Sequence, residues 1–159
     1  MILKRWITKG LILLAVCLPP SAGSPAREQV IEVDSVDSRL SRIKSFFKKR
    51  KCPAERYATE FLKAADKYRL DWRLLPSLAL VESGGGKAYR NNNIFGWDSC
   101  RYRFPSVTAG IHTVAERLAN SPIYRRKSLE QKLKTYNQNP QYGRIVKSVM
   151  GQLAAEPTS

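Results

Sequence analysis

The chain has 159 residues and a formal net charge of +15 at pH 7. A charge of this size favours a polyanionic partner, and nucleic acid is the usual partner of so basic an intracellular chain. A single histidine, His112, and cysteines without metal-ligand spacing exclude a recognisable zinc site, so we interpret His112 as an ordinary residue of a helix surface.

The first 23 residues are typical of a secretory signal peptide. Residues 1–9 contain three basic side chains, residues 10–18 are apolar, and small residues follow up to Gly23. The apolar run is shorter than the roughly 20 residues that a membrane span needs. We therefore predict cleavage after Gly23 and a secreted or periplasmic protein. A cut after Ala26, a lipoprotein that begins at an acylated Cys17, and an uncleaved anchor remain alternatives.

The positive charge belongs to the predicted mature protein. Residues 1–23 include no acid, so the rest of the chain keeps a net charge of +12. For an exported bacterial protein the polyanion at hand is the cell envelope. We expect anionic envelope polymers as partners, no nucleic acid, and no stable transmembrane span once the signal peptide is removed.

Residues 24–51 are rich in serine and charge and end in four consecutive basic residues. This composition predicts a basic linker between the signal peptide and the domain. Leu40, Ile43 and Phe47 have the spacing of a weak helix, whose basic and apolar character suits either a membrane surface or a face of the domain.

A helical pattern begins at Cys52. Pro53 suits the first position of a helix, and apolar residues then recur on one face at Tyr57, Phe61, Ala64 or Ala65, and Tyr68. A second helix is expected to begin at or after Asp71, with its regular part near Leu75. It should end at the triple glycine 84–86, because glycine adopts the left-handed cap conformation easily.

Residues 87–104 are expected to be irregular, with room for a short β-hairpin. Three more helices should begin near Ser106, at Ser128 and at Pro140, and Gln131 completes a capping box with Ser128. Their inward faces contain Val107, Ile111, Val114 and Leu118; Leu129, Leu133 and Tyr136; and Tyr142, Ile145 or Val146, Val149 and Leu153. The sequence thus predicts one compact, mainly α domain over residues 52–155.

Two cysteines, Cys52 and Cys100, remain after the signal peptide is removed. An even number of cysteines in an exported protein favours a disulfide. We therefore predict a Cys52–Cys100 bond that ties the start of the first domain helix to the loop after Trp97.

Glu82 is the candidate catalytic residue. It follows Leu75 and Ala79 along one helix face, so its carboxyl lies on the apolar stripe. Burial disfavours the ionised form and raises the pKa, and the partial negative charge at a helix C-terminus acts in the same direction. A carboxyl that keeps its proton is what general acid catalysis of glycosidic cleavage needs. The alternative is a solvated glutamate or one paired with Arg73 or Arg90.

The residues after Glu82 are suited to binding a sugar polymer. Residues 83–86 leave little side-chain bulk beside the acid. Asn93 offers an amide for hydroxyl and N-acetyl groups, and Phe95 and Trp97 offer flat apolar faces for pyranose rings. Each of these residue types is more often a turn or core residue, so only their combination points to a cleft.

The segment from Ala64 to Trp97, AADKYRLDWRLLPSLALVESGGGKAYRNNNIFGW, resembles the glucosaminidase and lytic transglycosylase branch of the lysozyme-like superfamily. In that branch a helix ends in the catalytic glutamate followed by serine and glycine, and a later Asn-x-Phe-Gly segment lines the cleft. Tyr136, Asn137, Pro140 and Tyr142 are similar to the family's Tyr-Asn segment, whose tyrosine approaches the cleaved bond. The resemblance covers most of residues 54–153.

This resemblance implies a lysozyme-like helical fold with a glycan cleft and an activity like that of mannosyl-glycoprotein endo-beta-N-acetylglucosaminidases. The implied substrate is the glycan strand of peptidoglycan, and no metal or cofactor is needed. Glu82 is implied as the catalytic acid, with Tyr136 near the reacting sugar. The residues implied in substrate binding are Ser83, which also supports the acid, Asn93, Phe95, Gly96, Trp97 and Asn137.

The sequence departs from the family at two points. Residues 94–97 replace the Gly-Leu-Met-Gln pattern of transglycosylases, and no second acid can be assigned, although most hydrolytic glycosidases use two carboxylates. The candidates are Asp98, Glu116 and Glu130. With one carboxylate, the N-acetyl group or 6-hydroxyl of the substrate would attack the sugar. A hydrolase, a lytic transglycosylase and a catalytically silent wall-binding scaffold therefore remain open, as does, on charge alone, a basic nucleic-acid or membrane-surface protein.

Overall fold

The computed structural model describes residues 37–158, which lie in a unit that begins at Asp34. The predicted signal peptide and the first part of the predicted linker lie outside these residues. The described chain is mainly helical, as predicted, and contains no strand, so the hairpin considered for residues 87–104 is absent from it. None of the helices in this part of the chain has the length and apolar character to span a bilayer.

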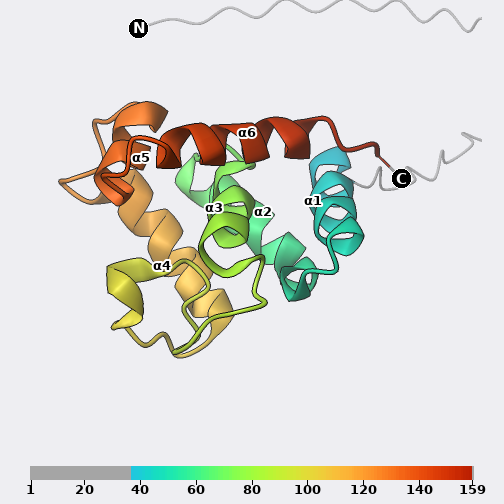
Figure 1. Ribbon diagram of the computed structural model, residues 1–159, viewed down its shortest axis with the longest axis horizontal. Coiled ribbons are helices and arrows are strands. Elements are labelled where there is room, and N and C mark those ends of the chain that lie inside the picture. The colour runs from blue at the N-terminus through green and yellow to red at the C-terminus, as the bar shows by residue number, and fades with distance from the viewer. Residues whose placement is uncertain (1–36, 159) are drawn as a thin grey trace, which may run out of the picture. The chain divides into compact units, whose positions relative to one another are not determined.

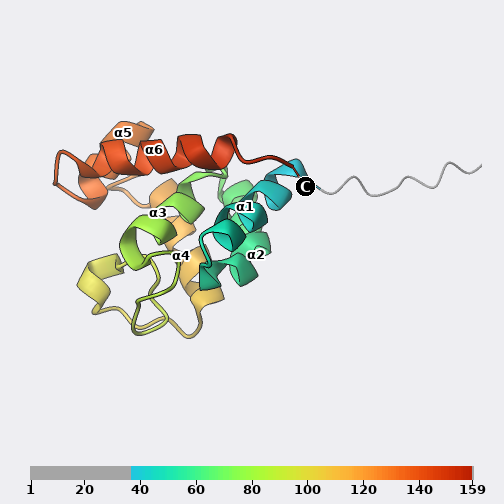
Figure 2. The same ribbon diagram turned by 45° about the vertical axis from the view of Figure 1, so that its right-hand side comes forward.

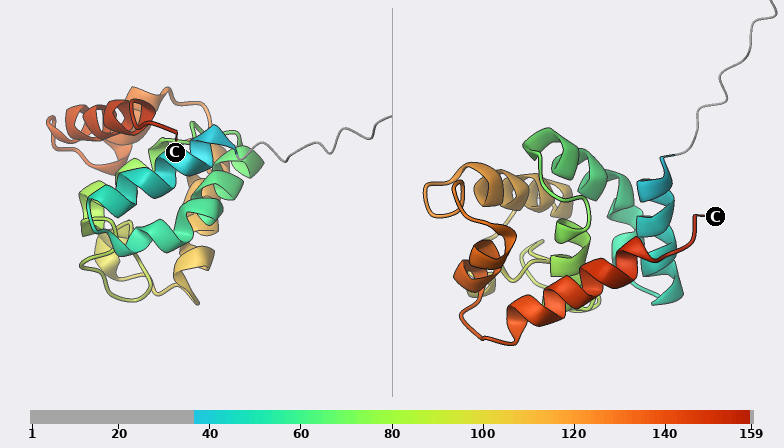
Figure 3. Two further views of the ribbon diagram at one scale, coloured as in Figure 1. Left: turned by 90° about the vertical axis from the view of Figure 1, so that its right-hand side faces the viewer. Right: turned by 90° about the horizontal axis from the view of Figure 1, so that it is seen from above.

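Six α-helices and two short 3-10 helices follow one another along the described chain. In order they are α1 (Ser38–Lys49), η1 (Pro53–Tyr57), α2 (Ala58–Tyr68), α3 (Leu74–Ser83), η2 (Trp97–Cys100), α4 (Val107–Asn120), α5 (Leu129–Tyr136) and α6 (Tyr142–Ala154). The last helix, α6, extends from α5 at one end to α1 at the other and crosses α3 between them (Figures 1 and 3). Helix α2 packs against both α1 and α4.

Helix α1 belongs to the domain, so the predicted linker is wrong for residues 38–51. Ile43, Phe46 and Phe47 are fully buried, and the Phe47 ring stacks on Phe61 of α2 with centroids 5.8 Å apart. Figure 2 shows α1 beside α2. The apolar face of α1 is therefore covered by the domain, which is the second of the two placements considered for this helix.

The C-terminal end of the chain also fixes α1 in place. The Arg42 guanidinium donates hydrogen bonds to the carbonyls of Ala154 and Glu156. The buried Glu156 carboxylate forms ion pairs with Lys49 at 2.6 Å and Arg50 at 3.4 Å. The basic residues at the end of the predicted linker are thus partly used in packing.

Three local signals for helix ends are confirmed, whereas the helix expected to open at Pro140 begins at Tyr142. Gly84 is left-handed, with φ of 60°, and the N–H groups of Gly84 and Gly85 both donate to the Ala79 carbonyl, which ends the helix. Ser106 caps α4, and Ser128 and Gln131 form the predicted capping box of α5. In α6 the core residue is Val146, whereas Ile145 is half exposed.

Candidate active site

Glu82 lies in the last turn of α3 with its side chain half-buried. The Tyr142 hydroxyl at the start of α6 donates a hydrogen bond of 2.5 Å to Glu82 Oε1. Gly96 lies on the other side of the carboxyl, where a Cβ atom would be 2.7 Å from Glu82 Oε2. Gly96 has a φ of 61°, so both its conformation and this close approach favour glycine. Three distant segments therefore enclose the acid.

Burial raises the pKa of the Glu82 carboxyl above its ordinary value, while the Tyr142 hydrogen bond opposes this shift. The direction agrees with the prediction from the apolar stripe. Burial and the neighbouring carboxyl also raise the pKa of Tyr142, so its hydroxyl stays protonated and remains a donor. Arg73 pairs with Asp71, and no basic residue of the described chain forms an ion pair with Glu82.

Glu82 opens onto a pocket of about 680 Å³ with an aromatic wall. The rings of Trp97 and Tyr136 meet edge to face at 5.6 Å, and Tyr136 stacks on Tyr142 at 5.8 Å. The pocket is lined by Glu82, Gly96, Trp97, Asp98, Ser99, Tyr102, Arg117, Ile123, Tyr124, Tyr136 and Asn137. Five of the residues expected at the site, namely Glu82, Gly96, Trp97, Tyr136 and Asn137, are thus brought together.

Three other residues expected to bind substrate do not line this pocket. Ser83, Asn93 and Phe95 are buried, which leaves no surface for a ligand. The Ser83 hydroxyl donates to the Ala79 carbonyl at 2.9 Å and accepts from the Gly86 N–H at 3.0 Å, so it stabilises the end of α3. Ser83 therefore supports the acid through the backbone that follows it.

Asn93 and Phe95 position the loop that contains Gly96 and Trp97. The Asn93 side chain accepts from the Trp97 N–H at 2.9 Å and donates to the Trp97 carbonyl at 2.8 Å. The Phe95 ring packs against Phe61, and its carbonyl accepts a 2.5 Å hydrogen bond from the Tyr136 hydroxyl. Both residues thus shape the pocket from behind its surface.

Of the candidates for a second carboxylate, only Asp98 lines the pocket. It forms an exposed ion pair with Arg101 at 2.8 Å. Glu130 is 82% exposed and lies 3.9 Å from Lys147 on another part of the surface, and Glu116 is not among the lining residues. Asp98 and Ser99 both have positive φ, a conformation that side chains rarely adopt.

The contact between Tyr142 and Glu82 was not anticipated from the sequence, where Tyr142 was placed on the core face and in the Tyr-Asn segment. Tyr124, Tyr102, Ile123 and Arg117 were also not expected at the site. One signal in the sequence could have indicated this contact: Tyr142 lies close along the chain to Tyr136, which is expected near the reacting sugar. In the structure the two rings stack beside the acid.

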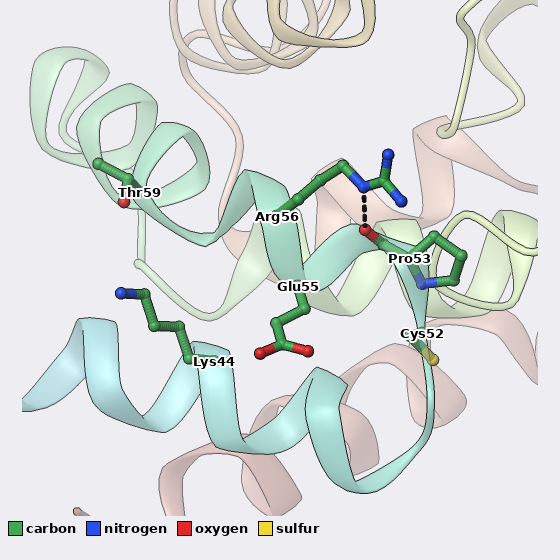
Figure 4. A pocket seen from close by; sticks show the side chains of 6 residues that line it. All are labelled: Lys44, Cys52, Pro53, Glu55, Arg56 and Thr59. Atoms are coloured by element: carbon green, nitrogen blue, oxygen red, sulfur yellow. Dashed lines mark hydrogen bonds between the residues drawn. The ribbon is translucent and has the colours of Figure 1, made fainter.

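The predicted disulfide between Cys52 and Cys100 is absent, and both cysteines are free within residues 37–158. Cys52 lies in a second pocket of about 530 Å³ between α1 and η1 (Figure 4), with its sulfur 3.4 Å from the Gly84 carbonyl oxygen. Cys100 ends η2, where its carbonyl accepts a hydrogen bond from Asn91. Cys52 thus precedes η1 beside α1 and Cys100 ends η2, and the spacing in the sequence did not reveal that the two are unpaired with each other.

The second pocket lacks the features of the first. Figure 4 shows Lys44, Glu55 and Arg56 around it, and the Arg56 guanidinium donates to the Pro53 carbonyl at 3.2 Å. It has no aromatic lining. Among residues 37–158 no group of three potential metal ligands lies together, and His112 contacts Glu60 at 3.1 Å.

Comparisons of the chain with known protein families, with curated proteins and with solved structures find no match. Only the residues and geometry of the chain itself therefore bear on its function. They provide a half-buried carboxyl with a raised pKa that can donate a proton to a group bound in an aromatic pocket.

Proposed function

We propose that this chain is an exported endo-glycosidase, similar to beta-N-acetylglucosaminidases, that cleaves the glycan strands of peptidoglycan with Glu82 as general acid. The main support is the environment of Glu82, which is half-buried, has a Tyr142 hydrogen bond and opens onto a pocket with aromatic rings. The proposed lysozyme-like fold rests on the resemblance of residues 64–97, and export rests on the composition of residues 1–23.

In the proposed reaction, protonated Glu82 donates its proton to the glycosidic oxygen as the bond breaks. The Tyr142 hydroxyl lowers the pKa of Glu82 relative to burial alone, which means that it favours the ionised form. It therefore stabilises the carboxylate that remains after proton transfer. Trp97 and Tyr136 line the pocket beside the acid, where their rings would contact the sugars.

A lytic transglycosylase on the same substrate is the second candidate. Two carboxyls line the pocket, and they favour this candidate because Asp98 forms an ion pair with Arg101. Glu82 forms no ion pair in the described chain, so it is the single available acid. A single acid suffices when a group of the substrate attacks the sugar. Product masses separate the two reactions, since attack by the 6-hydroxyl leaves anhydro-muramyl ends and hydrolysis leaves reducing ends.

Replacement of Glu82 by glutamine tests the general acid. Glutamine keeps the shape of the protonated carboxyl and can still accept the Tyr142 hydrogen bond, but it cannot donate a proton to the leaving oxygen. Because general acid catalysis typically contributes about 10² to 10⁴-fold, we expect Glu82→Gln to lose cleavage by a factor in this range. The measurements are turbidity loss of purified peptidoglycan and the release of soluble muropeptides.

Glu130→Gln is the matched control, because it makes the same change at an exposed glutamate outside the pocket. It should cleave like the wild type, and melting curves should show both variants folded. A folded Glu82→Gln protein that digests peptidoglycan as fast as the wild type would exclude Glu82 as the acid. If the wild type is itself inert while it binds the glycan, the scaffold hypothesis replaces the enzyme.

A further inference from the structure

Among residues 37–158, Arg117 of α4 is the only basic residue that lines the Glu82 pocket. Its guanidinium carbon lies 5.7 Å from the centroid of the Trp97 ring and 5.2 Å from that of Tyr102. At these distances the rings attract the cation. Arg117 is therefore fixed at the aromatic wall by two contacts that do not neutralise its charge.

Within the described part of the chain, the guanidinium of Arg117 has no acidic partner. Over residues 37–158 it forms neither an ion pair nor a side-chain hydrogen bond, whereas Arg101, Arg73 and Arg39 each pair with an aspartate. The pocket contains one other acid besides Glu82, and that acid, Asp98, is already paired with Arg101. The pocket thus keeps an unneutralised cation with all its hydrogen-bond donors available.

We infer that Arg117 binds a carboxylate of the substrate, so that the site prefers glycan strands containing muramic acid to neutral N-acetylglucosamine polymers. This inference rests on the proposed function, because it assigns the specificity of the same pocket. Guanidinium binds carboxylate with two parallel hydrogen bonds, which gives both strength and orientation. A neutral amino-sugar polymer offers hydroxyl and N-acetyl oxygens as acceptors, but it has no negative charge to pair with this cation.

Peptidoglycan offers such a carboxylate in two places. In strands without peptides the lactyl substituent of muramic acid ends in a free carboxylate. In strands with peptides this carboxyl is in an amide bond, and the carboxylates lie on the stem peptide. The chemistry that Arg117 would bind is the same in both, so the two sources must be separated by experiment.

The test measures binding in the Glu82→Gln background, where the proposed cleavage does not consume the ligand. Three ligands of equal sugar number are compared by calorimetry: a neutral N-acetylglucosamine oligomer, an alternating N-acetylglucosamine and N-acetylmuramic acid oligomer with free lactyl carboxylates, and the same oligomer with stem peptides. We expect tighter binding of a carboxylated ligand. Adding Arg117→Gln should raise its Kd about tenfold, the effect of losing a charge-assisted hydrogen bond, and leave the Kd of the neutral oligomer unchanged.

Two further variants separate charge, geometry and packing. Arg126→Gln removes the same charge from an exposed residue that does not line the pocket, so it should leave the selectivity intact. Arg117→Lys keeps the charge and loses the paired geometry, so it should restore part of the binding. The ligand whose affinity falls, lactyl or peptide-bearing, identifies the source of the carboxylate.

If Arg117→Gln weakens the binding of all three ligands equally, Arg117 only positions Trp97 and Tyr102, and the inference is overturned. The absence of any preference for carboxylated ligands would also overturn it. Cleavage of peptidoglycan by the wild type is measured separately. Selective binding without cleavage would refute the proposed function and leave carboxylate recognition standing. Cleavage by the wild type, together with a ligand preference that Arg117→Gln does not change, would support the proposed function and overturn the inference. Failure to bind any of the three ligands would overturn both.

Discussion

Replacing Tyr142 by phenylalanine removes the one hydrogen bond that a described side chain donates to Glu82. Burial raises the pKa of Glu82, and the Tyr142 hydroxyl lowers it. In Tyr142→Phe only the effect of burial remains, so the pKa of Glu82 should rise further. A general acid works in its protonated form, and its activity falls as the pH passes its pKa. The alkaline limit of cleavage should therefore move to higher pH.

The size of this shift follows from the energy of the lost hydrogen bond. A hydrogen bond to a charged group contributes about 1.5–3 kcal/mol, and one pKa unit corresponds to about 1.4 kcal/mol. A donor that contacted only the carboxylate would thus change the pKa by about one to two units. The hydroxyl also donates to the neutral acid, and the carboxyl is partly exposed to solvent, so we expect a shift at the lower end of this range.

Carbon-13 NMR titration of the Glu82 carboxyl, assigned by its loss in Glu82→Gln, measures the pKa without relying on catalysis. Initial rates of peptidoglycan cleavage across the same pH range test the consequence. Tyr124→Phe is the matched control, because Tyr124 lines the same pocket and, like Tyr142, is 5% exposed, but has no hydrogen bond to Glu82. A folded Tyr142→Phe protein with an unchanged or lower Glu82 pKa would refute this account of the site.

Two other substitutions test the framework of the site. Phe47→Ala in α1 should destabilise the protein by about 3–5 kcal/mol, because it empties a fully buried site that packs on Phe61; unfolding in urea measures this, and a negligible change would restore the linker interpretation. Gly96→Ala should reduce stability by about 1–2 kcal/mol, because residue 96 has a left-handed conformation. It should also displace the Glu82 carboxylate, which lies 2.7 Å from the new Cβ. Cleavage should therefore fall well below that of Gly151→Ala, whose Cβ meets no atom within 4 Å. Equal activity of these two glycine variants would show that the close approach of residue 96 to Glu82 is unimportant.

Local chemistry predicted the helix ends of this chain well. Ser128 and Gln131 form a capping box because both partners lie within one turn of each other. Gly84 ends α3 because the left-handed conformation of that residue suits glycine. Such signals depend on neighbours along the chain, so they can be read without knowledge of the tertiary structure. The apolar stripe of α3 likewise predicted that Glu82 would be drawn toward the interior.

Contacts between distant segments were the part that the sequence concealed. Tyr142 and Glu82 are 60 residues apart, and nothing local to either predicts their hydrogen bond. The sequence left open whether the apolar face of α1 packs on the domain, because basic residues alternate with apolar ones along this helix. Asn93 was expected to bind sugar, but a buried amide must satisfy its own hydrogen bonds, and those of Asn93 are used on the Trp97 backbone.

The aromatic rings of the pocket also explain how an acid and an unpaired arginine coexist in it. Glu82 accepts a hydrogen bond from Tyr142, Tyr142 stacks on Tyr136, Tyr136 meets Trp97 edge to face, and Arg117 lies over Trp97. An arginine in direct contact with Glu82 would lower the pKa of the carboxyl and use up its own charge. Ring contacts instead fix Arg117 at the wall, and it forms no ion pair with Glu82 in the described chain. The carboxyl can therefore keep its raised pKa, and the guanidinium can remain free for an anionic ligand. The same ring contacts thus serve both the proton donor and the proposed carboxylate site.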